Sequence, residues 1–135
     1  MKKSQVGTEY LMVMGFVSLI LVPLVIVYFT SVQDTSDEIG SRQAINIARK
    51  IVDSSESVYF LGEPSQTTLK VSVPQNVQSA SVNGREVVFI MKTKSGPSDL
   101  VQISSVNMTG SLPNEPGQYL ITIKAESDKV SISYS

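Results

Sequence analysis

The sequence contains no cysteine, no histidine and no tryptophan. Without cysteine the chain has no disulfide framework, no thiolate nucleophile and no zinc–thiolate site. Without histidine as well, only carboxylates, lysines and hydroxyls remain for catalysis, and no pair of them stands out as poised for proton transfer. We therefore expect that the protein is not an enzyme and holds neither a cofactor nor a metal.

An excess of basic charge is also missing. The 135 residues include 11 lysines and arginines against 12 aspartates and glutamates, and no segment carries a basic stripe. Because contacts with phosphate backbones require such a stripe, nucleic acid is not an expected partner. The length leaves room for one small globular unit and one extended element.

Charged residues are absent from the segment 10–33, which is dominated by leucine, valine, isoleucine, methionine and aromatic side chains. An apolar run of this length reaches the roughly 20 residues that a helix needs to cross a bilayer. Lys2 and Lys3 precede the run, and Asp34 and Asp37 follow it. The positive-inside rule therefore predicts an N-terminus in the cytoplasm and everything after the run outside.

Two ordinary interpretations of this segment compete with a more specific one. A secretory signal peptide has a shorter apolar region and a small-residue cleavage site after it, and neither is found here. A plain single-pass anchor fits the length, but it leaves Glu9, at the edge of the run, as nothing more than an interfacial residue.

The more specific interpretation comes from the sequence KKSQVGTEYL at positions 2–11. It resembles the class III signal peptide of archaeal type IV pilin-like proteins, in which a basic leader, a glutamine and a glutamate precede the apolar segment in that order. The resemblance implies cleavage between Ser4 and Gln5 by a prepilin peptidase, with the apolar helix kept in the mature protein. Ser4 replaces the usual glycine and Gly7 the usual serine, and both remain small.

Cleavage at this position would give Glu9 a partner. It would create an ammonium group at Gln5, one helical turn before Glu9 on the same face. A carboxylate in apolar surroundings is costly unless it is paired or neutralised. The amine of the same chain or that of a neighbouring subunit would satisfy it, and a pair between chains would fix the register of assembly.

The next segment has the spacing of an amphipathic helix. Ile45, Ala48 and Val52 recur at helical intervals, with charged residues on the other side. Joined to the apolar run, it would form one stem of about 50 residues, in which Pro23 predicts a kink and Thr35 to Glu38 have the spacing of a capping box. The predicted organisation is a leader at 1–4, a helix at 5–60 with an apolar part at 5–33 and an amphipathic part at 34–60, and a head at 61–135.

From about residue 61 the sequence becomes short alternating runs separated by turn residues, which predicts six or seven strands. Asn83-Gly84 is the signal of a type I′ hairpin turn. The fold class expected is therefore α+β, with a long helix followed by a small antiparallel β-sandwich. The pilin resemblance implies an immunoglobulin-like head. Asn107-Met108-Thr109 is a sequon for N-glycosylation, which we expect in a surface loop.

The resemblance also implies partners and a location. Copies of the chain would polymerise into a helical surface filament for adhesion, with an assembly ATPase and a membrane platform protein as partners and the cytoplasmic membrane as the site of the precursor. Two alternatives remain. One is a membrane-anchored minor subunit or binding module with a β-sandwich ectodomain, and the other is the subunit of an archaeal motility filament.

Overall fold

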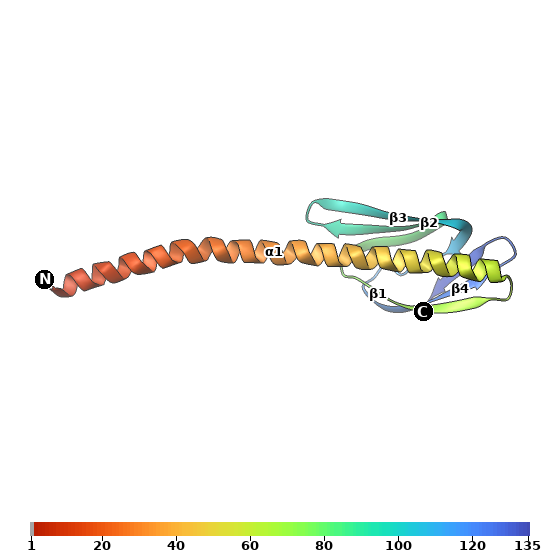
Figure 1. Cartoon of the computed structure of the whole chain (residues 1–135), viewed down its shortest axis with the longest axis horizontal. Coiled ribbons are helices and arrows are strands. Elements are labelled where there is room, and N and C mark those ends of the chain that lie inside the picture. Colours follow the sequence, from red (N-terminus) through yellow and green to blue (C-terminus); the bar gives the residue numbers. More distant parts are fainter. Residues whose placement is uncertain (1) are drawn as a thin grey trace. The chain divides into compact units, whose positions relative to one another are not determined.

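The apolar and amphipathic segments belong to one unbroken helix. The computed structural model describes residues 2–135, and the side chains of all of these except residues 2–4 and 33. The chain forms two compact units, Met1–Ser36 and Asp37–Ser135 (Figure 1). The elements are α1 (Lys2–Leu61), β1 (Gln66–Val73), β2 (Val77–Thr93), β3 (Gly96–Gly110), β4 (Gly117–Ala125) and β5 (Val130–Tyr134).

The second half of α1 belongs to the C-terminal unit because one of its faces is apolar. The predicted amphipathic pattern is confirmed, since Ala48 and Val52 are buried while Arg49 and Lys50 are exposed. The buried stripe recurs every three or four residues, as a helix lying on a core requires. It comprises Ala44, Ile47, Ala48, Ile51, Val52, Ser55 and Val58. The compact unit Asp37–Ser135 therefore includes the amphipathic part of α1 together with the residues 61–135 that were expected to form the head.

The predicted capping box does not interrupt the helix. The hydroxyl of Thr35 donates a hydrogen bond to the Ser31 carbonyl at 2.9 Å, and that of Ser36 donates to the Val32 carbonyl at 3.0 Å. Both bonds reach back four residues along the helix, where such side chains pair when they lie inside it. The helix also continues through Pro23.

The five strands form one hydrogen-bonded sheet in the order β1-β4-β5-β3-β2. All neighbouring pairs are antiparallel except β3 and β5, which are parallel through Met108 to Gly110. Gly110 permits this pairing, because a Cβ there would collide with the backbone of Ile132. Its φ of +134° is also one that side chains other than glycine rarely adopt.

The element β2 folds back on itself near Gly84. The Lys92 amide donates a hydrogen bond of 2.7 Å to the Asn76 carbonyl, although a straight strand would separate two residues that far apart in sequence by about 50 Å. The predicted reversal at Asn83-Gly84 is therefore confirmed. The predicted turn type is wrong. A type I′ turn needs positive φ at both central residues, and among the described residues only glycines have positive φ, so Asn83 does not.

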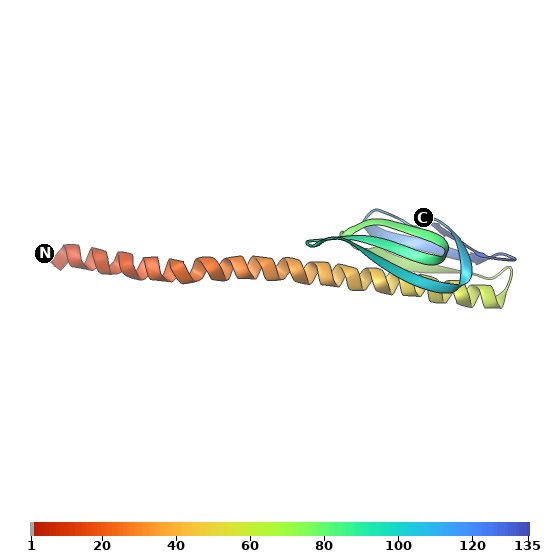
Figure 2. The same ribbon diagram turned by 90° about the horizontal axis from the view of Figure 1, so that it is seen from above.

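Helix α1 supplies the layer that covers the sheet within the C-terminal unit. Figure 2 shows this part of α1 running along one face of the strands. Side chains from the helix and from all five strands form one buried cluster, of which the largest members are Ile51, Phe89, Met91, Met108, Ile121, Ile123 and Ile132. The α+β class is thus confirmed, with a five-stranded, mostly antiparallel sheet. The immunoglobulin-like sandwich is not confirmed, because the helix occupies the place of a second sheet.

Candidate functional site: the apolar helix and the Glu56 contact

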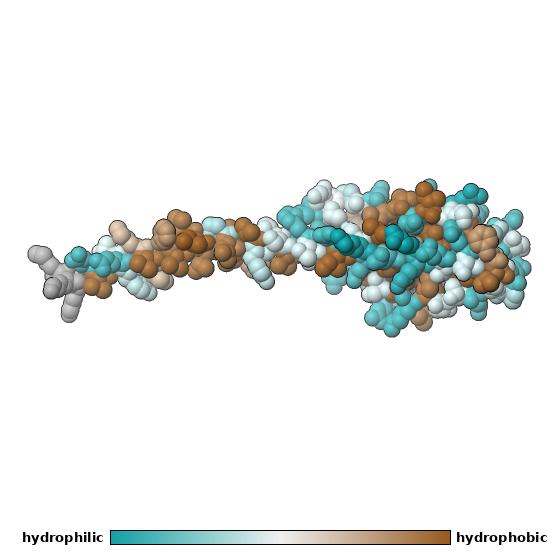
Figure 3. Space-filling view, viewed as in Figure 1, coloured by the Kyte–Doolittle hydropathy of each residue, from teal (hydrophilic) through white to brown (hydrophobic). Residues whose placement is uncertain are grey.

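The helix of the N-terminal unit exposes apolar side chains on every side. From Val6 to Val32 its large apolar residues are 42–73% exposed, and Figure 3 shows this apolar surface in brown. Burying one such side chain is favourable by about 1.5–3 kcal/mol. A helix that is apolar all round is therefore stable in lipid or among other helices, and not in water.

By length and composition, α1 is able to cross a membrane. Its most apolar window lies near the N-terminus and is wholly exposed. A signal sequence at the start of a chain has the same two properties, so this finding is common to a membrane anchor and a signal sequence.

Glu9 lies at the cytoplasmic edge predicted for this apolar surface. Its side chain is exposed, and Gln5 is four positions earlier on the same continuous helix. Within the described residues the carboxylate has no ion-pair partner. Gly7, between them in sequence, is equally open, since a Cβ there would have no atom within 4 Å. Charge pairing of Glu9 with an amine at Gln5 remains a prediction.

The leader itself is only partly described. The side chains of Lys2, Lys3 and Ser4 lie outside the described residues, so the basic residues of the signal motif and the cleavage position at Ser4-Gln5 remain predictions.

A contact that sequence reasoning missed lies at the other end of α1. The register between β2 and β3 breaks there, because the partners change from Glu86–Ile103 to Gly84–Met108. The strand β3 therefore advances by five residues while β2 advances by two. The extra residues form a bulge, and its main-chain amides lose their partners on β2.

Glu56 supplies a hydrogen-bond acceptor for this bulge. Its Oε1 accepts hydrogen bonds from the Ser105 amide at 2.8 Å, the Ser105 hydroxyl at 2.9 Å and the Ser104 hydroxyl at 3.3 Å. The Ser104 oxygen in turn accepts a bond from the Val106 amide at 3.2 Å. The bond with the Ser105 amide, followed by those with the hydroxyls, holds the pKa of Glu56 below its ordinary value, while burial opposes this shift.

The sequence offered little signal for this contact. The helical spacing places Glu56 among the charged residues on the polar side of the helix, but it is half-buried at the border of the apolar stripe. The bulge depends on the register of two strands, which local patterns do not fix once a strand is interrupted.

The glycosylation sequon lies in a strand and not in the expected loop. Asn107 and Thr109 are exposed on β3, while Met108 between them is buried. The alternation of a strand therefore places the acceptor and the hydroxyl of the sequon on the same outer face. Occupancy by a glycan remains a prediction.

Neither the chemistry of the described residues nor comparison with known proteins adds a second site. In the described part of the chain, no three acidic side chains gather where a metal ion would bind. No family model, no curated protein and no solved structure matches the chain. We therefore infer the function from the residues themselves.

Proposed function

We propose that this chain is the structural subunit of an archaeal type IV pilus-like filament, in which the apolar helices of many copies pack together and the β units face the solvent. The observation that supports it best is the apolar surface of α1. Its large side chains are exposed on all sides between Val6 and Val32, with one carboxylate, Glu9, at the edge.

A filament and a membrane both satisfy such a helix. The precursor would reside in the cytoplasmic membrane, and cleavage between Ser4 and Gln5 would release the helix for assembly. Each copy then buries its helix among copies above and below, and such a contact does not close into a ring. The assembly is therefore an open helical polymer, with an ATPase and a platform protein driving extraction from the lipid and adhesion as its use.

The same exposed helix supports a second candidate. A membrane-anchored minor subunit or binding module would keep the helix in lipid and present the C-terminal unit outside. This candidate needs neither the processed N-terminus nor the charge of Glu9, and this difference makes the two separable.

The test is the mature N-terminus of protein sheared from the cell surface. After digestion with trypsin, an unprocessed chain yields a peptide that begins at Ser4, because trypsin cleaves after Lys3. A peptide that begins at Gln5, as glutamine or pyroglutamate, is expected in the sheared fraction. A strain without the prepilin peptidase is the control, in which the peptide should begin at Ser4. A Ser4 peptide from wild-type cells, with the protein in the membrane pellet, would favour the anchored module.

A further inference from the structure

A pocket of about 330 Å³ opens between the last turns of α1 and the start of β1, within the C-terminal unit. It is at the small end of the range of ligand pockets in proteins. Four hydroxyl groups and two apolar side chains line it: Ser54, Ser57, Ser65, Thr67, Val58 and Leu61.

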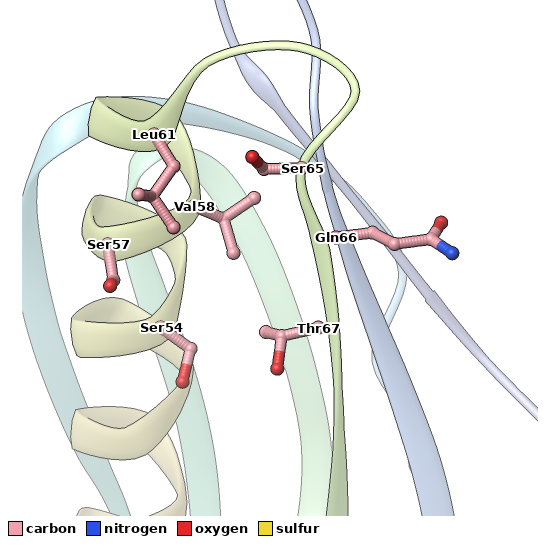
Figure 4. A pocket seen from close by; sticks show the side chains of 7 residues that line it. All are labelled: Ser54, Ser57, Val58, Leu61, Ser65, Gln66 and Thr67. Carbon is pink, nitrogen blue, oxygen red and sulfur yellow. The ribbon is translucent and has the colours of Figure 1, made fainter.

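The side chains of this pocket are free to bind a ligand. In Figure 4, Ser65 and Thr67 extend from the strand segment toward the helix, Val58 extends toward the strand, and Gln66 extends to the other side. Within the described residues, none of the four hydroxyl groups has a hydrogen-bond partner. The hydrogen-bonding capacity of the pocket is therefore unused.

The lining excludes some ligands and favours others. It contains no charged side chain, so an anion or cation would lose hydration without gaining a counter-charge. The carbonyl end of a helix carries partial negative charge, which favours ligands that donate hydrogen bonds. Two other hollows among the described residues of this unit each include a charged residue, Lys50 and Lys70 in one and Asp99 in the other.

The pocket also has an exposed apolar side chain in its lining. Leu61, which lines the pocket, is 74% exposed. A neutral sugar combines hydroxyl groups at its edge with apolar C–H faces, which pack on such side chains. We propose that this pocket binds a neutral saccharide unit, with Ser54, Ser65 and Thr67 as hydrogen-bonding groups and Leu61 against the ring face.

Only the biological role of sugar binding rests on the proposed function, because a filament with a sugar site on each subunit would adhere to glycans. Sugar binding itself is a property of the C-terminal unit. It is therefore measured on full-length protein in detergent, whether or not filaments form, and the morphology of sheared fractions is examined separately.

The test is saturation-transfer difference NMR with a panel of neutral hexoses, N-acetylhexosamines and their disaccharides. The expected result is transfer to at least one neutral sugar and none to uronic acids or amino sugars. Thr67→Val keeps the shape of the side chain and removes its hydroxyl, so binding should weaken about fivefold. Thr68→Val is the matched control, since Thr68 is exposed beside it on the opposite face of β1 and near Thr122.

Two results would overturn the saccharide proposal. One is the absence of transfer to every neutral sugar, and the other is binding that Thr67→Val and Thr68→Val reduce equally. Neither result bears on the filament, which stands or falls on the N-terminus at Gln5. Conversely, an unprocessed N-terminus together with sugar binding would indicate the anchored binding module.

Discussion

The Glu56 carboxylate and the Ser105 amide are separated by 49 positions in the sequence and by 2.8 Å in the fold. Their hydrogen bond joins the helix to the bulge of β3, where the strand has lost its partner on β2. Because a bulge leaves main-chain amides without ladder partners, a side chain from another layer must replace them. Glu56 does this while it also accepts bonds from two serine hydroxyls.

Replacing Glu56 by alanine should loosen this bulge. The Ser105 amide would lose its acceptor, and we expect the C-terminal unit to lose about 1–2 kcal/mol of stability, moderated by access of water to the site. Thermal unfolding of the full-length protein in detergent, followed by the near-ultraviolet circular dichroism of tyrosine, measures the loss. Hydrogen exchange should accelerate most at Ser105 and Val106.

Asp53→Ala is the matched control. Asp53 is exposed on the same helix, and its replacement removes one carboxylate without changing a contact of the bulge. Equal effects of the two substitutions, or unchanged exchange at Ser105 in Glu56→Ala, would show that the contact does not support the bulge.

The same carboxylate predicts a dependence of stability on pH. Hydrogen bonds to the ionised form hold the pKa of Glu56 below its ordinary value, so the folded state binds a proton less readily than the unfolded state. Its contribution is therefore complete above the unfolded pKa of about 4.3 and is lost as the pH falls through the lower folded pKa. Unfolding curves at successive pH values should show that the free energy of unfolding declines in this acidic range, and that this decline is smaller in Glu56→Gln. An identical decline in both proteins would contradict the assignment.

Local patterns predicted most of the elements, because each has a strong periodicity of its own. Ala48 and Val52 follow the helical period and identified the amphipathic face, and Gly84 marked the reversal within β2. The layering was not predictable in the same way. Alternating strands need a covering layer but do not specify it, and the stripe of α1 supplied what a second sheet was expected to provide.

Non-local features account for the rest. The bulge of β3 depends on its pairing with two other strands, since Met108 pairs with Gly84 of β2 on one side and with Val130 of β5 on the other. No local pattern contains that information. The pocket at the end of α1 likewise joins Ser54 to Thr67 across a turn whose geometry the sequence does not fix.

Alanine at Gly110 should destabilise the C-terminal unit strongly. A Cβ there would meet the Ile132 backbone, including its carbonyl carbon at 2.7 Å, and would also have to adopt a φ of +134°. Gly96→Ala is the matched control, because Gly96 has a φ of +119° but no atom within 4 Å of a Cβ. We expect about 1–3 kcal/mol for the backbone strain alone and a larger loss at Gly110. Equal losses in unfolding experiments would mean that the β3–β5 contact is not close-packed.

Alanine at Ser55 should be tolerated or stabilising. Ser55 is fully buried in the apolar stripe of α1, and its hydroxyl has no hydrogen-bond partner among the described residues. Removing a buried unsatisfied hydroxyl and gaining helix propensity should together add about 0.5–1 kcal/mol. Ser57→Ala, at an exposed position, measures propensity alone. A loss of stability in Ser55→Ala would instead indicate that the hydroxyl has a partner in solution, such as a buried water.

Glu9 separates assembly from membrane insertion. It is one carboxylate at the edge of a long apolar surface, and its proposed partner is the ammonium that processing creates at Gln5. Glu9→Ala removes the charge without making the helix less apolar, so membrane insertion should be unchanged while filaments become scarce. Glu9→Gln keeps the size of the side chain and should behave like Glu9→Ala, because the charge is the property required.

The measurement compares the amount of protein in the membrane and sheared fractions and counts filaments by electron microscopy. Gly15→Ala is the control for a change within the apolar surface, since a Cβ at Gly15 has no atom within 4 Å and leaves the charge of Glu9 in place. Filaments at wild-type abundance in Glu9→Ala would exclude a charge pair as the register device. Loss of the variant from the membrane fraction would instead place the role of Glu9 in insertion, before any contact between subunits forms.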